Sequence, residues 1–261
     1  MILRYFIEIY PQRSSGPGIF YDVRHPLLDA EITFEEVRQV LRKIAKDKTP
    51  GLVVINNDFY AGLPNCWVKY ITDIFNLALD LALKHGYVPE DWCSSLVTLI
   101  YKKGNHLDPI NYRDIALMNC ITKIFTTLLF RRLIKWSEIN KIIPESQCGF
   151  RPGRSCDDVL FSLQAKIAIA LAKQGGKLYA VMIDSKRAFD SVDHNILWET
   201  LYIVGISAQM IRVLQSLYNR ASMKVQIDNF NNTNTIDVTE GVLQGDPLSP
   251  LLFSMFISDI E

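Results

Sequence analysis

Two short segments of the chain hold residues whose types and spacing could carry chemistry. In the first, the apolar run 178–183 leads to a single carboxylate, Asp184, and an aromatic residue, Phe189, follows five positions later. A carboxylate at the end of a strand can bind Mg²⁺ ions that bridge a triphosphate and a hydroxyl group. Phe189 could lie beneath a bound sugar and exclude a 2′-hydroxyl group. The common alternatives are an aspartate that caps a turn and an aromatic ring buried in the core.

The second segment, 244–250, has the sequence Gln-Gly-Asp-Pro-Leu-Ser-Pro. Gln244 can both donate and accept hydrogen bonds, so it could contact a templating base or a nucleotide. Gly245 would let the backbone approach a ligand closely. The alternative is a loop that only begins a helix, because Pro fits well in a first helical turn.

Basic residues are concentrated in the middle of a chain whose formal net charge is zero. Residues 102–154 hold ten Lys or Arg against four Asp or Glu, so this span carries a net charge of about +6. Lys102, Lys103 and Arg113 fall just after a predicted strand and in a loop, where they could bind the phosphates of a nucleotide or a template. A solvated basic surface is the alternative.

A second basic feature is the predicted turn 149–155, which presents Arg151 and Arg154 beside an aromatic residue. Such a turn could contact single-stranded nucleic acid, because bases stack on aromatic rings and phosphates pair with Arg. It could equally be a structural turn that leads into a capped helix. The four histidines are scattered, and no zinc, nucleophile or nucleotide-binding glycine motif is present.

Apolar periodicity, capping signals and turn residues predict the elements that must position these side chains. The predicted helices are Thr33 to about Ile44, Val68–Lys84, Asn119–Trp136, Ser155–Lys173, His194–Val204, Ala208–Tyr218 and one that begins at Ser249. The predicted strands are Leu96–Tyr101, Leu178–Asp184, Met223–Ile227 and Thr235–Val242. Residues 1–30 are predicted to be irregular. Because helices and strands are mixed without a regular βαβ order, we expect an α+β fold.

Composition sets outer limits on the kind of protein. The 261 residues are 49% hydrophobic, which is enough for a substantial core. Five cysteines without CxxC spacing indicate free thiols in a reducing compartment. The first ten residues do not resemble a signal peptide, and no apolar run is long enough to span a membrane. We therefore expect an intracellular protein of the nucleus or cytoplasm, with no membrane contact.

The order of the motifs resembles that of a known family more strongly than any single motif does. Over residues 31–261 the chain is similar to the reverse transcriptase domain of non-LTR (LINE-type, Jockey-like) retrotransposons. The resemblance implies a right-hand polymerase, with fingers at 31–177 and part of the palm at 178–261. The motifs that carry it, in order, are Pro50-Gly51, the segments 99–104 and 111–113, and the segments 147–155, 183–190 and 244–250.

The resemblance also implies a reaction and roles for individual residues. The reaction is two-metal transfer of deoxynucleotides onto a DNA primer, directed by an RNA template. By this resemblance Asp184 is the catalytic ligand of Mg²⁺, and the nucleotide is bound by Lys103, Arg113, Phe189, Gln244 and Gly245. Phe189 would be the gate that selects the sugar. Lys102, Arg151 and Arg154 would contact nucleic acid.

The chain also departs from the family pattern. The paired aspartates of the aromatic-Ala-Asp-Asp motif do not occur in it, and no thumb region is recognisable. Asp184 alone would leave the Mg²⁺ site incomplete. We therefore expect a fragment that is inactive by itself, with an open sheet edge and poorly covered apolar helices. The alternative is a non-catalytic RNA-binding or structural remnant of the same domain.

Overall fold

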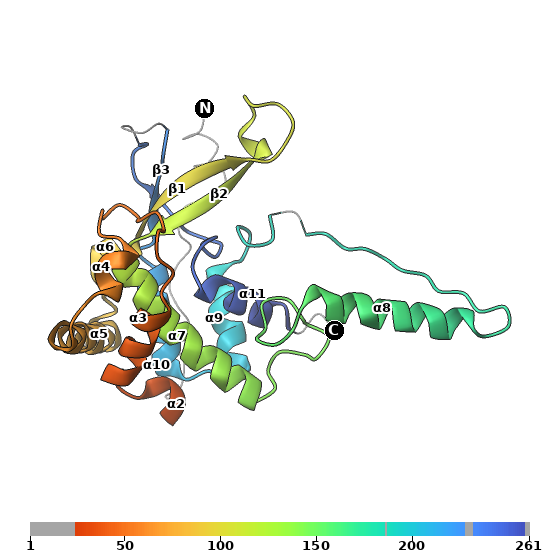
Figure 1. Ribbon diagram of the computed structural model, residues 1–261, viewed down its shortest axis with the longest axis horizontal. Coiled ribbons are helices and arrows are strands. Elements are labelled where there is room, and N and C mark those ends of the chain that lie inside the picture. The colour runs from red at the N-terminus through yellow and green to blue at the C-terminus, as the bar shows by residue number, and fades with distance from the viewer. Residues whose placement is uncertain (1–23, 186, 228–231, 259–261) are drawn as a thin grey trace.

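The computed structural model describes residues 24–185, 187–227 and 232–258, and it has the mixed α+β architecture that the sequence predicts (Figure 1). The helices are α2 (Pro26–Asp29), α3 (Phe34–Lys43), α4 (Asn57–Ala61), α5 (Asn65–His85), α6 (Glu90–Cys93), α7 (Cys120–Ile139), α8 (Cys156–Leu171), α9 (His194–Ile203), α10 (Ala208–Tyr218) and α11 (Leu248–Phe256). The strands are β1 (Ser94–Tyr101), β2 (Tyr112–Met118), β3 (Ser222–Val225) and β4 (Ile236–Asp237), and a 3₁₀ turn covers Pro109–Asn111.

Local signals account for the ends of the long helices. At the start of α3, the Thr33 amide donates to the Glu36 carboxylate at 2.8 Å, and the Thr33 hydroxyl accepts from the Glu36 amide at 3.3 Å. This capping box satisfies two of the donors that a helix start leaves open. The helix α5 ends at Gly86, whose positive φ of 59° suits glycine. Both predicted helices are confirmed to within a few residues.

The sheet joins segments that are far apart in the sequence. Its strand order is β2-β1-β3-β4, in which β1 and β2 are antiparallel, β1 and β3 are parallel, and β3 and β4 are antiparallel. The β1–β2 pair runs in full register from Ser95 opposite Met118 to Tyr101 opposite Tyr112. The two strands form a long hairpin that extends from the helical body (Figure 1). Its tip is therefore accessible from several sides.

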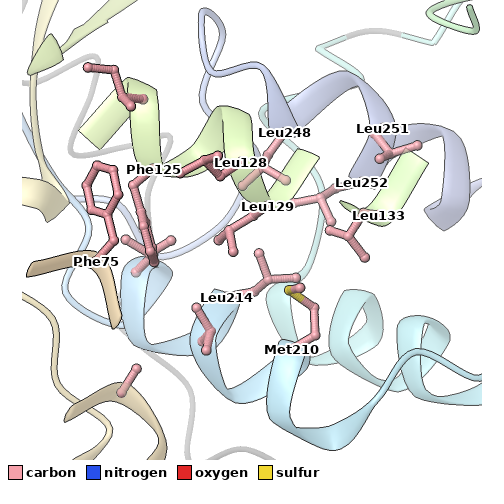
Figure 2. Close-up of a cluster of buried hydrophobic side chains, with 14 of the residues drawn as sticks. Phe75, Phe125, Leu128, Leu129, Leu133, Met210, Leu214, Leu248, Leu251 and Leu252 are labelled. Carbon is pink, nitrogen blue, oxygen red and sulfur yellow. The ribbon is translucent and has the colours of Figure 1, made fainter. Parts of the chain in front are cut away.

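Helix α7 runs through the core and is largely buried. Its side chains meet those of α5, α10 and α11, as Figure 2 shows for a cluster that includes Phe75, Phe125, Leu128, Leu129, Leu133, Met210, Leu214 and Leu252. The ring of Phe125 lies 5.3 Å from that of Phe75 and 5.0 Å from that of Trp92, measured between centroids. Burying large aromatic and aliphatic side chains together is the main stabilising contribution to such a core. This core supports the base of the hairpin.

The predicted strand Leu178–Asp184 is wrong. Residues 177–185 have no regular secondary structure, and Tyr179, Val181 and Ile183 are more than four-fifths exposed. A run of β-forming residues becomes a strand only where another strand satisfies its backbone groups, and no described strand pairs with this segment. Together with α8, the segment forms an arm that projects from the body (Figure 1). None of the residues of α8 is buried, as expected for a poorly covered apolar helix.

Two elements differ from the sequence-based expectation in smaller ways. Strand β2 falls where a loop was expected, because Arg113 and Asp114 hide the alternation of apolar residues. Within the supposedly irregular residues 1–30, α2 begins at Pro26, and residues 1–23 lie outside the described part. No helix in the described part of the chain combines the length and apolar character that crossing a membrane requires.

Candidate nucleic-acid interface

The tip of the β1–β2 hairpin presents basic and aromatic side chains to solvent. Lys102 and Lys103 are exposed, and the Lys102 amide donates to the Asn111 carbonyl at 2.8 Å, which closes the hairpin behind them. The ring of Tyr101 stacks on that of His106 at a centroid distance of 3.9 Å, and its hydroxyl donates to the Gly104 carbonyl at 2.7 Å. The hairpin therefore holds two cations beside an ordered, partly exposed ring, a combination suited to a nucleic-acid strand.

Arg113 lies on strand β2, opposite Ile100, and not in a loop. Its side chain is exposed. Because successive side chains of a strand point to opposite faces, Arg113 and Asp114 are directed to different sides of the hairpin. The hairpin thus carries both predicted phosphate ligands, Lys103 and Arg113. The Arg113 side chain lies on the opposite face of the hairpin from that of Asp114.

The Gln244–Gly245 loop is docked on the edge of β2. The Ala116 amide donates to the Gln244 carbonyl at 2.7 Å. Gly245 has a φ of +123°, and a Cβ at this position would lie 2.6 Å from the Ala116 carbonyl oxygen. Glycine is required here because any side chain would meet the β2 backbone. The backbone at Gly245 thus approaches strand β2 of the protein closely, whereas the sequence predicts a close approach to a ligand.

Asp190 is a site residue that the sequence did not identify. Its carboxylate accepts from the Gln244 side-chain amide at 3.1 Å. Burial raises the pKa of Asp190, and the nearby Asp114 carboxylate raises it further, whereas the hydrogen bond from Gln244 lowers it. Lys102 is close enough to lower it as well. The hydrogen bond between Asp190 and Gln244 joins segments 54 positions apart, which no local pattern shows.

Phe189 is half-buried and packs against the core. Its ring is stacked on that of Phe253 at 4.8 Å and meets the edge of Phe150 at 6.2 Å. The Val242 amide donates to the Phe189 carbonyl at 2.8 Å, which joins the backbone at Phe189 to the segment that leads into Gln244. This backbone hydrogen bond places Phe189 beside the segment that precedes the predicted nucleotide ligand Gln244, but the contacts of its ring are those of a core aromatic.

Asp184 stands apart from the residues just described. It is exposed, and no hydrogen bond or ion pair joins it to another described residue. Among residues 24–185, 187–227 and 232–258, no group of three or more His, Cys, Asp or Glu is arranged to hold a metal ion.

The turn 149–155 uses its arginines internally. Arg151 is buried and donates to both oxygens of Glu138 at 3.0 and 2.9 Å, and to the Pro144 carbonyl at 2.8 Å. The hydrogen bonding between Arg151 and Glu138 raises the pKa of Arg151 and lowers that of Glu138. Arg154 is ion-paired with Glu145. The geometry favours the structural alternative for this turn, which ends in the predicted capping box of α8.

Asp246 is a second residue whose importance the sequence did not reveal. Its side chain is 4% exposed and accepts from the Leu248 amide at 3.2 Å, at the start of α11. Burial raises the pKa of Asp246 to about 6. Burial, and then the charge of Asp246, raise the pKa of the Tyr218 phenol. A buried acid thus anchors the loop that carries Gln244 and Gly245. The one sequence signal for this role is the position of Asp246 just before the start of a predicted helix.

Comparison with known proteins identifies the family. The family model described as reverse transcriptase (RNA-dependent DNA polymerase) matches residues 100–261, which is more than half of the chain. The chain belongs to the reverse transcriptase family. It is 30% identical, over 88% of its length, to the RNA-directed DNA polymerase from mobile element jockey of Drosophila melanogaster. It is 31% identical, over 89% of its length, to the probable RNA-directed DNA polymerase from transposon X-element of the same species.

A third relative is the retrovirus-related Pol polyprotein from type-1 retrotransposable element R2 of Popillia japonica, to which the chain is 27% identical over 70% of its length. These relatives confirm the resemblance to non-LTR retrotransposon reverse transcriptases. The chain spans about a quarter of their length, 24% for jockey and 25% for X-element and R2. The matched region includes the hairpin tip, Asp184 and the Gln244–Gly245 loop.

Proposed function

We propose that the chain is the nucleic-acid-binding part of an RNA-directed DNA polymerase, comprising fingers at 31–177 and part of a palm at 178–261. The parent enzyme would add deoxynucleotides to a DNA primer on an RNA template by two-metal nucleotidyl transfer. The observation that carries the proposal is the basic hairpin tip within the region that matches the family. Lys102, Lys103 and Arg113 are exposed there, the two lysines directly after the end of β1 and Arg113 on β2.

Within this proposal the hairpin and the Gln244 loop have separate roles. Lys103 and Arg113 bind nucleotide phosphates, and Lys102 binds the template backbone, because cationic side chains supply most of the affinity for phosphates. Gln244 lines the nucleotide pocket, held by Asp190 and by the β2 backbone. Phe189 limits the space at the sugar. Asp184 is the catalytic Mg²⁺ ligand of the parent.

We further propose that this chain does not polymerise by itself. Support comes from the exposed position of Asp184, which has no hydrogen bond or ion pair to another described residue. The chain would then bind RNA without catalysis, which was the alternative left open by the sequence. Arg151 and Arg154 contribute less to this binding than the hairpin lysines do, since their charges are already paired.

Binding to a primer-annealed RNA template tests the proposal. We expect affinity to fall by about tenfold or more on Lys102→Glu/Lys103→Glu, and the slope of log K against log salt to decrease by about 2. The matched control is Lys173→Glu/Lys177→Glu, which makes the same charge change at exposed positions beyond the end of α8. Equal loss of affinity in both variants would show that the hairpin has no specific role.

A further inference from the structure

A cavity of about 410 Å³ lies between α2, α5, α7 and α10 and takes no part in the proposed polymerase function. Its apolar lining comes from Leu28, Leu79, Leu83, Leu129, Met210 and Val213. Its acidic lining consists of Asp29, Glu31 and Asp80. Helices α2 and α10 lie at the end of the body opposite the β1–β2 hairpin (Figure 1). The cavity is therefore separate from the basic surface.

The walls of the cavity are held firmly in place. Arg132 is buried and donates to both oxygens of Glu36 at 2.8 and 2.9 Å, and to the Glu31 carbonyl at 2.8 Å. Asn76 on α5 accepts from the Ile32 amide at 2.7 Å and donates to the Ile32 carbonyl at 2.9 Å. These contacts tie the segment after α2 to α5 and α7. The cavity is thus pre-formed, which lowers the entropic cost of binding a ligand.

The charge at the cavity is negative. Among the described residues that line the cavity, the one cation is Arg132, and its charge is paired with that of Glu36. Asp80 is ion-paired with Lys84 at 2.5 Å, but both side chains are more than half exposed, so water screens this pair. Glu31 is exposed, and Asp29 accepts hydrogen bonds from neutral groups only, the His25 amide and the Ser207 hydroxyl. A cationic partner would be attracted, and the phosphates of a nucleic acid would be repelled.

An exposed apolar row on α5 extends the cavity into a groove. Tyr70, Ile74 and Leu77 follow one another at helical spacing and are 67%, 44% and 59% exposed. Leu77 also lines the cavity, so the row leads directly into it. Large apolar side chains exposed in a continuous row mark interaction surfaces more often than single ones do.

We propose that this groove binds one amphipathic helix of a partner protein, with an apolar anchor side chain and flanking Lys or Arg residues. The anchor fills the cavity, as in other complexes of a helix in an apolar groove. Its basic neighbours face Glu31 and Asp80, and its apolar face covers Leu77 and Ile74. Because the groove is remote from the hairpin, the partner and the RNA template can be bound together.

A displayed library of helical peptides, randomised on one face and selected against the 261-residue chain, tests the proposal. We expect the selected peptides to share a large apolar residue with Lys or Arg within one helical turn. The affinity of the best peptide, measured by fluorescence anisotropy, should fall about tenfold or more on Leu77→Asp and again on Glu31→Lys. The matched control Ile169→Asp, at an exposed position of α8, should leave it unchanged.

Three outcomes would overturn the proposal. One is that no selected peptide depends on Leu77 while circular dichroism shows the variant to be folded. Another is that the selected peptides lack basic residues, or that RNA displaces them. The last is that sedimentation shows a dimer of the free chain that Leu77→Asp dissociates, which would assign the groove to a second copy. The first and last of these outcomes depend neither on polymerase activity nor on RNA binding by the hairpin, so they separate a failure of this proposal from a failure of the proposed function.

Discussion

Gly245→Ala should destabilise the protein far more than an ordinary replacement of glycine. The φ of +123° at Gly245 costs an L-residue about 1–3 kcal/mol, and the new Cβ would lie 2.6 Å from the Ala116 carbonyl oxygen. Relieving this contact means moving the loop off β2, which breaks the hydrogen bond from the Ala116 amide to Gln244 and costs about 1 kcal/mol. The total is about 2–4 kcal/mol.

The control for this prediction is Gly153→Ala. Gly153 also has a positive φ, +71°, but nothing lies within 4 Å of a Cβ placed there. The cost should be about 1 kcal/mol, the usual penalty of the left-handed conformation. Urea unfolding followed by circular dichroism measures both variants, with the free energy taken from the midpoint and slope. Equal losses at the two positions would refute the claim that the Gln244–Gly245 loop is packed on β2.

Three further predictions follow from buried or exposed side chains. Arg132→Met should lower the free energy of unfolding by about 3–5 kcal/mol, because Glu36 loses its buried partner. The control Arg42→Met, at an exposed position of α3, should change this free energy by less than about 0.5 kcal/mol, and urea unfolding measures both variants. Because folding raises the pKa of Asp246 from 3.8 to about 6, the folded protein favours the protonated acid, and this group contributes about 3 kcal/mol of stability below pH 4 that is lost as the pH rises through 6. When the free energy of unfolding is measured from pH 4 to 7, Asp246→Asn should remove this dependence on pH. An unchanged dependence would contradict the buried position of the acid. Because α8 exposes large apolar side chains, we expect the chain to self-associate through it, and Phe161→Glu should reduce this self-association in sedimentation without lowering the urea midpoint. A large drop in the midpoint would show that α8 is buried in solution.

Elements defined by local signals could be predicted from the sequence. The capping box at Thr33, the helical period of α5 and its end at Gly86 all depend on residues a few positions apart, and the structure contains them. The segment Leu178–Asp184 shows the limit of this approach. Its residues favour a strand, but a strand also requires a partner, and propensity says nothing about where a partner lies.

The candidate site was predictable in composition but only partly in geometry. Lys102, Lys103 and Gln244 were identified because cations and amides suit nucleic acid wherever they are exposed. The hydrogen bond between Asp190 and Gln244 crosses 54 positions, and the pairing of β1 with β3 joins segments more than 120 positions apart, so no local pattern reveals either. Arg151 was misleading for the same reason, since its partner Glu138 lies on another element.

The most direct test of the account is a single assay in which the chain is mixed with a primer-annealed RNA template, deoxynucleotides and Mg²⁺, and both binding and primer extension are recorded. We expect salt-dependent binding that Lys102→Glu/Lys103→Glu weakens, with no extension of the primer. Extension of the primer that Asp184→Ala abolishes would contradict it, because the exposed Asp184 would then belong to a complete catalytic site.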